Sequence, residues 1–288
     1  MNKFNLGTVI SAIALILLPG LVFADGKISV RLQGGWSYVL GGDANLGTKA
    51  FFDYYGAGWD TQTGRYRAVH NGYEVGGDII FELSPRLGIG IGGGYVRTSR
   101  HSRIGLHAAG PSLGSGSVYA RPRLSAIPIR ASAYLTVPWK EKFHFLVNAG
   151  LSYYFRSRYS DESEATYFPG PSYLFITTRA EYKRAPIGFQ GGISLEYEMG
   201  RNFIPYLEAR VRYARFRGWE GTSVLESDYE ISLSEQGILY YEVVPKLTNA
   251  PRLLLVQSLP PDGPGGEPRQ AAIDISGISL QFGIRIRL

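Results

Sequence analysis

The chain has 288 residues, 44% of them hydrophobic, with 37 glycines, 20 tyrosines, no cysteine and a formal net charge of +6. Without cysteine the chain carries no disulfide, no thiol nucleophile and no lipid-modified cysteine. Beyond the first segment no apolar run approaches the roughly 18 residues of a membrane-spanning helix, which excludes helical spans but not strands, whose alternating residues average out in hydropathy.

The amino-terminal segment has the organisation of a secretory signal peptide. A short basic start precedes an apolar core over residues 6–18, and Pro19-Gly20 ends that core. Small residues follow at the two positions that signal peptidase recognises. We therefore predict a signal peptide over 1–24 and one mature domain over 25–288. The alternative is an uncleaved membrane anchor, which the Pro-Gly break disfavours.

Eight segments of the mature chain alternate apolar and polar residues. This period of two is typical of a strand with one apolar and one polar face, as in 143–155, where Val147 and Leu151 oppose Asn148 and Ser152. Each segment is long enough for a tilted strand to cross a bilayer, which takes about 9–11 residues. The predicted strands are 27–40, 73–83, 87–98, 124–137, 143–155, 187–199, 203–216 and 278–288.

The connections between these segments are alternately long and short. Short turns are predicted at 84–86, 138–142 and 200–202, and long loops at about 41–70, 99–121, 157–185 and 217–270. This asymmetry is typical of transmembrane barrels. We therefore predict an all-β fold, an antiparallel up-and-down barrel of eight strands. Two strand-like segments in the last loop, 238–244 and 252–259, are predicted to form a hairpin; the alternative is two more membrane strands and a narrow ten-stranded pore.

The last strand also carries a terminal motif. Gln281, Gly283, Ile286 and Leu288 match the assembly signal of outer-membrane β-barrels: a polar residue, a glycine and two apolar or aromatic residues. The final residue of that signal is most often Phe and is Leu here. On this motif and on its architecture, the chain resembles the small eight-stranded outer-membrane barrels related to OmpW, OmpX and the OmpA membrane domain.

The resemblance implies an outer-membrane protein with periplasmic turns and extracellular loops. It implies contact with outer-membrane lipids and lipopolysaccharide, and biogenesis through periplasmic chaperones and the barrel assembly machinery. The basic charge then fits anionic lipid, and we expect no nucleic-acid partner. Such barrels serve envelope integrity, surface interaction or passage of small hydrophobic compounds, so we expect a non-catalytic monomer without cofactor or metal. The alternative is a lipid-modifying hydrolase.

The polar faces of the strands are rich in charge. Aromatic residues at both strand ends indicate two membrane interfaces, so the apolar face is predicted to meet lipid and the polar face the lumen. Side chains fill the interior of an eight-stranded barrel, and an isolated buried charge is costly, so we expect the charges to pair and plug the lumen. The predicted lumen charge network is Arg31, Glu74, Asp78, Glu82, Arg130, Glu196, Glu208, Arg210, Arg212 and Arg285.

Two details follow from the alternation. Glu82 and Asp78 should lie opposite the inward glycines Gly88 and Gly92, which leave room for long arginine side chains. The same parity assigns Arg156 to the lumen.

The first long loop is unusually aromatic. Its candidate contacts for lipid, a small hydrophobic ligand or a partner are Phe51, Phe52, Tyr54, Tyr55 and Trp59. The alternative is that these rings pack against neighbouring loops.

The second long loop contains the one pair that suggests a hydrolase, His101-Ser102. A catalytic serine needs a histidine and an orienting acid or amide. Adjacent residues on a strand point to opposite faces, and no orienting partner is evident, so a solvated loop is favoured.

Overall fold

The structure, a computed structural model, describes residues 27–108, 114–168, 172–182, 186–200, 202–227, 232–244, 250–256 and 268–288. The predicted signal peptide, 1–24, lies outside these residues. In the described part of the chain, no helix is long and apolar enough to cross a membrane.

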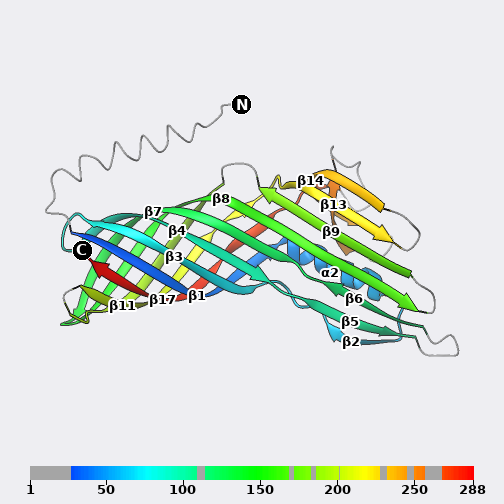
Figure 1. The fold of residues 1–288 in the computed structure, drawn as a ribbon, viewed down its shortest axis with the longest axis horizontal. Helices are drawn as coiled ribbons and strands as arrows, with labels where there is room; N and C mark the ends of the chain where they lie inside the picture. The colour runs from blue at the N-terminus through cyan, green and yellow to red at the C-terminus, as the bar shows by residue number, and fades with distance from the viewer. Residues whose placement is uncertain are drawn as a thin grey trace.

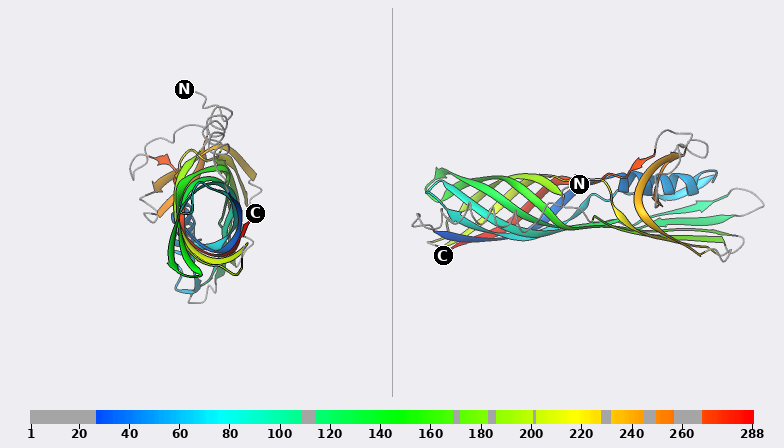
Figure 2. Two further views of the ribbon diagram at one scale, coloured as in Figure 1. Left: turned by 90° about the vertical axis from the view of Figure 1, so that its left-hand side faces the viewer. Right: turned by 90° about the horizontal axis from the view of Figure 1, so that it is seen from above.

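Eight strands form a closed antiparallel ring, seen end-on in Figure 2. They are β1 (Ile28–Gly42), β3 (Asn71–Glu82), β4 (Leu87–Ser99), β7 (Arg123–Lys140), β8 (Phe143–Phe168), β10 (Ile187–Tyr197), β11 (Phe203–Tyr213) and β17 (Ile273–Arg287). Each pairs with the next, and β17 closes the ring on β1. The predicted eight-stranded up-and-down barrel is confirmed. Because β11 pairs directly with β17, the ten-stranded alternative is wrong.

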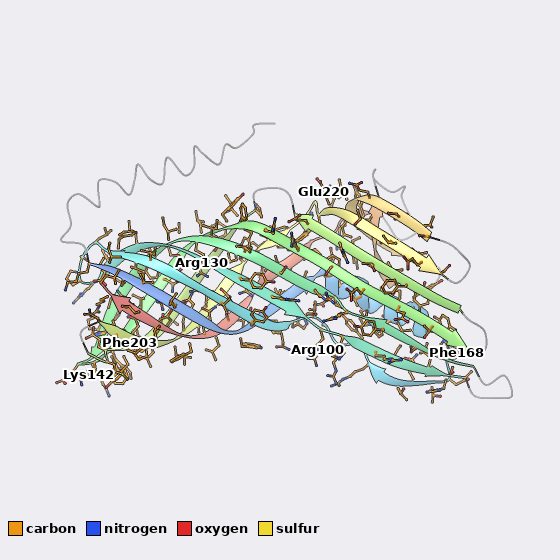
Figure 3. The ribbon with its side chains drawn as sticks, viewed as in Figure 1. Arg100, Arg130, Lys142, Phe168, Phe203 and Glu220 are labelled. Atoms are coloured by element: carbon orange, nitrogen blue, oxygen red, sulfur yellow. The ribbon has the colours of Figure 1, made fainter. Side chains whose placement is uncertain are left out.

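The ring is apolar outside and polar inside. On β17, Phe282 is 63% exposed while its neighbour Gln281 is fully buried. Aromatic clusters lie at both ends of the ring, such as Tyr73 with Tyr95 at one end and Trp139 with Phe143 at the other. Figure 3 shows side chains standing out along the whole wall. An exposed apolar belt around a buried polar interior is the arrangement that lipid requires, so the predicted faces are confirmed.

Beyond the ring, the long connections are mostly strands rather than loops (Figure 1). Ring strand β8 is 26 residues long, and its second half continues beyond the ring. There, further strands pair with it on both sides. The resulting open sheet, here called the extension, has the order β2–β5–β6–β8–β9–β13–β14–β15. Its other members are β2 (Thr61–Arg65), β5 (Ser102–His107), β6 (Ser115–Ala120), β9 (Ser172–Tyr182), β13 (Glu220–Ser227), β14 (Ser232–Val244) and β15 (Ala250–Val256).

The predicted hairpin in the last connection is present as β14 and β15, which pair from Ile238 with Val256 to Val244 with Ala250. Residues 257–259 of that prediction lie outside the described part. Two short strands, β12 (Arg215–Phe216) and β16 (Arg269–Gln270), join the extension to the ring.

The first long connection contains a helix, α2 (Asp43–Gly56), where the sequence predicted a loop. Gly41 and Gly42, with φ of 77° and 59°, turn the chain from β1 into the helix, a conformation that glycine tolerates best. Asp43 lies in the first turn, where a carboxylate suits the helix dipole. The helix packs against β15 and the inner side of the extension, so it is stabilised by burial.

A β-bulge changes the facing of β8. Ile127 of β7 pairs with Arg156, but Pro128 pairs with Tyr154, so Phe155 is an extra residue. Proline has no N–H to give to a ladder and is found in sheets at such irregularities. One extra residue moves every later side chain to the opposite face.

The bulge corrects one sequence prediction. Beyond it, Ser157 and Tyr159 are buried on the inner face, while Arg156 and Arg158 are exposed on the outer face. Arg156 therefore does not line the lumen; its guanidinium lies 3.3 Å from the Glu181 carboxylate outside the sheet.

Candidate functional site

The lumen of the ring is occupied by charged side chains, with Glu74 of β3 at the centre. Its carboxylate accepts hydrogen bonds from Arg130, Arg210 and Arg212, at 3.4, 3.3 and 2.6 Å. The Ser279 hydroxyl donates a fourth, at 2.7 Å. Because Glu74 is only 2% exposed, the surrounding guanidinium groups replace the water that would otherwise solvate its charge.

A second group of contacts surrounds Arg31 of β1. Its guanidinium lies 3.0 Å from the Glu208 carboxylate and donates to the Ser194 hydroxyl at 2.8 Å. It also lies over the Tyr206 ring, 3.9 Å from the centroid, which is a cation–π contact. Glu208 in turn pairs with Arg210 at 2.9 Å, and this joins the second group to the first.

A third group lies toward the short turns. Arg285 pairs with Glu196 at 3.0 Å and with Glu82 at 2.5 Å. Below it, Arg287 pairs with Glu198 at 2.7 Å, and the His144 imidazole lies 3.3 Å from the same carboxylate.

The structure thus brings together all ten residues of the predicted network. Asp78 completes it through Arg130, 3.1 Å away. The set contains five arginines, Arg31, Arg130, Arg210, Arg212 and Arg285, and five carboxylates, Glu74, Asp78, Glu82, Glu196 and Glu208. The five positive and five negative charges of this set cancel, so the network itself is electrically neutral.

Glycines make room for this network. Glu82 lies opposite Gly88 and Asp78 opposite Gly92, in the predicted register. A Cβ atom on Gly92 would overlap the Asp78 carboxylate, so a side chain at that position would displace Asp78 from Arg130.

An apolar layer covers the network where the ring meets the extension. The layer includes the fully buried Trp219 and Ile273, packed with Leu124 and Tyr159 in one cluster. The lumen therefore has a charged lower part and an apolar upper part.

The candidate aromatic contacts of the first connection lie on and just after α2. Phe52 is 3% exposed and packs in a cluster with Leu106 and Val118. Trp59 stacks on Tyr167, with centroids 5.7 Å apart and planes at 6°. Further ring contacts include Phe51 with Tyr55, at 4.7 Å, and Tyr54 with Tyr55, at 4.8 Å. These rings mainly pack against the extension, the alternative that the sequence left open.

His101 and Ser102 lie in different surroundings and do not act as a pair. The Ser102 hydroxyl accepts from the Arg67 amide at 2.9 Å and donates to the Arg67 carbonyl at 3.1 Å. Ser102 is buried and His101 exposed, so the hydroxyl holds a backbone segment in place. Among the described residues, no group of three His, Asp or Glu side chains could hold a metal ion.

The assembly-signal residues lie on β17 and at its end. A Cβ atom on Gly283 would meet the Tyr206 hydroxyl and the Leu32 carbonyl. Packing by itself therefore requires glycine at this position. Gln281 faces the lumen, and Ile286 pairs with Val30 of β1. Their role in membrane assembly remains a prediction.

Sequence reasoning missed a half-buried acid in the extension. The Asp161 carboxylate accepts from the Thr48 hydroxyl of α2 at 3.4 Å and from the Ser163 hydroxyl at 3.2 Å. Burial raises the pKa of Asp161 to about 6, and it also raises the pKa of the neighbouring Tyr66 and Tyr159. The sequence predicted a loop over 157–185, so it assigned Asp161 to neither face of a strand, whereas β8 runs to Phe168.

Comparison with known proteins found distant structural likeness. No protein-family model and no curated protein matches the chain. A major outer membrane protein from Thermus thermophilus is similar in structure, with 13% identity and a TM-score of 0.38, covering 92% of this chain and all of that one. OprG from Pseudomonas aeruginosa is also similar in structure, with 10% identity and a TM-score of 0.33, covering 90% of this chain and 95% of that one. The outer membrane protease OmpT from Escherichia coli is similar as well, with 12% identity and a TM-score of 0.32, covering 91% of this chain and 96% of that one.

A closed ring leaves no backbone polar group of a strand edge in lipid, and closed barrels are the form in which strands span membranes. With its closed eight-stranded ring, apolar outer belt and polar interior, the chain is a small β-barrel protein of the outer membrane.

Proposed function

We propose that this protein is a non-catalytic outer-membrane barrel with a closed lumen, which anchors a rigid extension outside the cell for envelope integrity or surface interaction. The observation that carries the proposal is the neutral charge network together with the apolar layer above it. An ion or solute could pass only if buried ion pairs separated and the apolar layer opened.

The energetics support a barrel that stays closed. Breaking a buried ion pair by removing one partner costs about 3–5 kcal/mol, because the remaining charge is left unsolvated. Opening a path through the lumen would break several such pairs at once. Passage of small hydrophobic compounds through the lumen finds no support in this arrangement.

The hydrolase alternative is supported by no observation on the described residues. The hydroxyl that suggested it, that of Ser102, is engaged with the backbone of Arg67. Mature protein incubated with phospholipid, lipid A and unstructured peptide should release no acyl chain and no fragment. Specific turnover of any of these substrates would contradict the non-catalytic role.

The closed lumen is tested by conductance. In planar bilayers the refolded wild type should show only small or transient currents. The double variant Arg210→Gln/Arg212→Gln should raise the leak, because it leaves Glu74 with one of its three guanidinium partners. Arg65→Gln/Arg103→Gln, which removes two exposed arginines from the extension, is the matched control. Large and steady wild-type openings would refute a closed lumen.

A further inference from the structure

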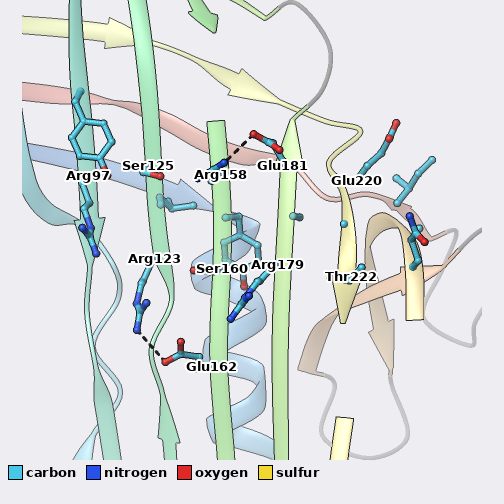
Figure 4. Close-up of a pocket in the computed structure, with 18 residues that line it drawn as sticks. Arg97, Arg123, Ser125, Arg158, Ser160, Glu162, Arg179, Glu181, Glu220 and Thr222 are labelled. Atoms are coloured by element: carbon cyan, nitrogen blue, oxygen red, sulfur yellow. Dashed lines mark hydrogen bonds and ion pairs between the residues drawn. The ribbon is translucent and has the colours of Figure 1, made fainter. Parts of the chain in front are cut away.

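A groove of about 820 Å³ crosses the outer face of the sheet where the ring meets the extension (Figure 4). It is formed by β4, β7, β8, β9, β13 and β14. In Figure 4, α2 lies behind the sheet and the labelled side chains stand on the opposite face. The groove is therefore separate from both the lumen and the core of the extension.

Two neighbouring rungs of the sheet supply its side chains. In the first rung, Arg97 pairs across the ladders with Ser125, and Ser125 with Arg158. In the second rung, Arg123 pairs with Ser160, and Ser160 with Arg179. Arg158 reaches this face because of the bulge at Phe155; without it, the side chain would point inward.

The charges of the groove do not cancel. Arg123 pairs with Glu162 at 3.1 Å, while Arg156 and Arg158 share one carboxylate, Glu181, at 3.3 and 3.4 Å. Within the described ranges, no carboxylate lies at ion-pair distance from the remaining two arginines, Arg97 and Arg179. Four arginines and three glutamates line the groove, Glu220 included, so one positive charge remains.

The position of the groove points to its occupant. Directly below it, the upper edge of the apolar belt presents Phe155, Ile187 and Tyr213, which are 57%, 60% and 62% exposed. A molecule that fits both surfaces is anionic where it meets the groove and apolar where it meets the belt. A phospholipid-type amphiphile of the outer leaflet has this polarity, with its phosphate at the level of the membrane interface.

We propose that this groove binds the phosphorylated headgroup of an outer-leaflet lipid, with Arg97 and Arg179 binding phosphate and the acyl chains lying along Phe155 and Ile187. The two arginines are three strands and one rung apart, roughly 16 Å at the backbone, so they suit a headgroup with a phosphate at each end. Arginine binds phosphate through paired N–H groups, which gives geometry as well as charge. The proposal rests on the outer-membrane placement and not on the closed lumen.

Lipid A with two phosphates is the probe. The full mature chain is placed in phosphatidylcholine nanodiscs containing this lipid, and bound lipid is measured by native mass spectrometry. Wild type should retain lipid A, and Arg97→Gln/Arg179→Gln should bind it at least about tenfold more weakly, as expected when charge-assisted hydrogen bonds are lost. Neither substitution breaks a described ion pair, so folding should be unchanged. Arg65→Gln/Arg103→Gln, away from the groove, should bind like wild type.

Three further measurements distinguish the alternatives. Ser160→Glu, which places an anion between Arg123 and Arg179, should also weaken binding. Wild type should bind monophosphorylated lipid A more weakly than the bisphosphorylated form. The double variant, which lacks both arginines, should bind the two forms alike. Inorganic pyrophosphate should fail to displace the lipid. Equal binding by the double variant, or displacement by pyrophosphate at lipid-like concentrations, would overturn the proposal, and a conducting lumen would not affect it.

Discussion

Replacing Glu74 with glutamine should strongly destabilise the barrel. The substitution keeps the volume of the side chain and one acceptor oxygen for the Ser279 hydroxyl, but removes the charge that three buried arginines share. Removing one partner of a buried ion pair costs about 3–5 kcal/mol, and a typical total stability is about 5–15 kcal/mol. We therefore expect Glu74→Gln to lose about 3 kcal/mol, a large part of the total.

A double-mutant cycle shows whether this loss comes from the network. Arg212 makes the shortest contact with Glu74, at 2.6 Å, so Glu74→Gln/Arg212→Gln removes one charge of each sign and restores neutrality. Its free energy of unfolding should exceed the value expected from adding the two single losses by about 1–3 kcal/mol. Glu141→Gln, in an exposed turn, is the control and should change little.

The assay is urea unfolding in lipid vesicles, followed by tryptophan fluorescence and by the change in electrophoretic mobility that folded barrels show. Both probes should give one transition for each variant. If Glu74→Gln is as stable as wild type, or if the two single losses simply add, then the lumen charges do not act as a coupled network.

Three other changes test the remaining parts of the structure. Val147→Arg, on the lipid face of β8, should cost roughly 2–4 kcal/mol in bilayers, and Val147→Leu should cost little; a harmless arginine would mean that this face does not meet lipid. Because the folded pKa of Asp161 is raised to about 6, the folded state binds the proton more tightly than the unfolded chain, so stability of the extension should rise as pH falls from 7 toward 5 and level off below the ordinary carboxyl pKa. Amide hydrogen exchange of α2 should report this trend in wild type and lose it in Asp161→Asn; the same pH dependence in both proteins would exclude Asp161 as the cause. Gly283→Val should weaken the barrel even when refolded into detergent, because its side chain would strike Tyr206; normal detergent stability together with failed insertion in cells would assign Gly283 to assembly alone.

The ring could be predicted from the sequence because alternation is a local property. Successive side chains on a strand point to opposite faces, so Val147 and Asn148 already indicate a lipid face and a lumen face without knowledge of any partner strand. Burial of charge in a narrow lumen then requires pairing, and the candidates for the charge network followed from parity alone.

The features that the sequence did not reveal depend on partners distant in the chain. α2 has no clear apolar periodicity, and it is a helix because the extension buries Phe52 and because Arg269 holds Asp43 through two contacts of 2.6 and 2.9 Å. The segments predicted as loops became strands because β8 continues past the membrane and offers unpaired edges on both sides. The outward turn of Arg156 arises from the pairing of Pro128 with Tyr154: proline signals an irregularity in its own strand, but which residue of the partner strand is the extra one depends on the register between the two.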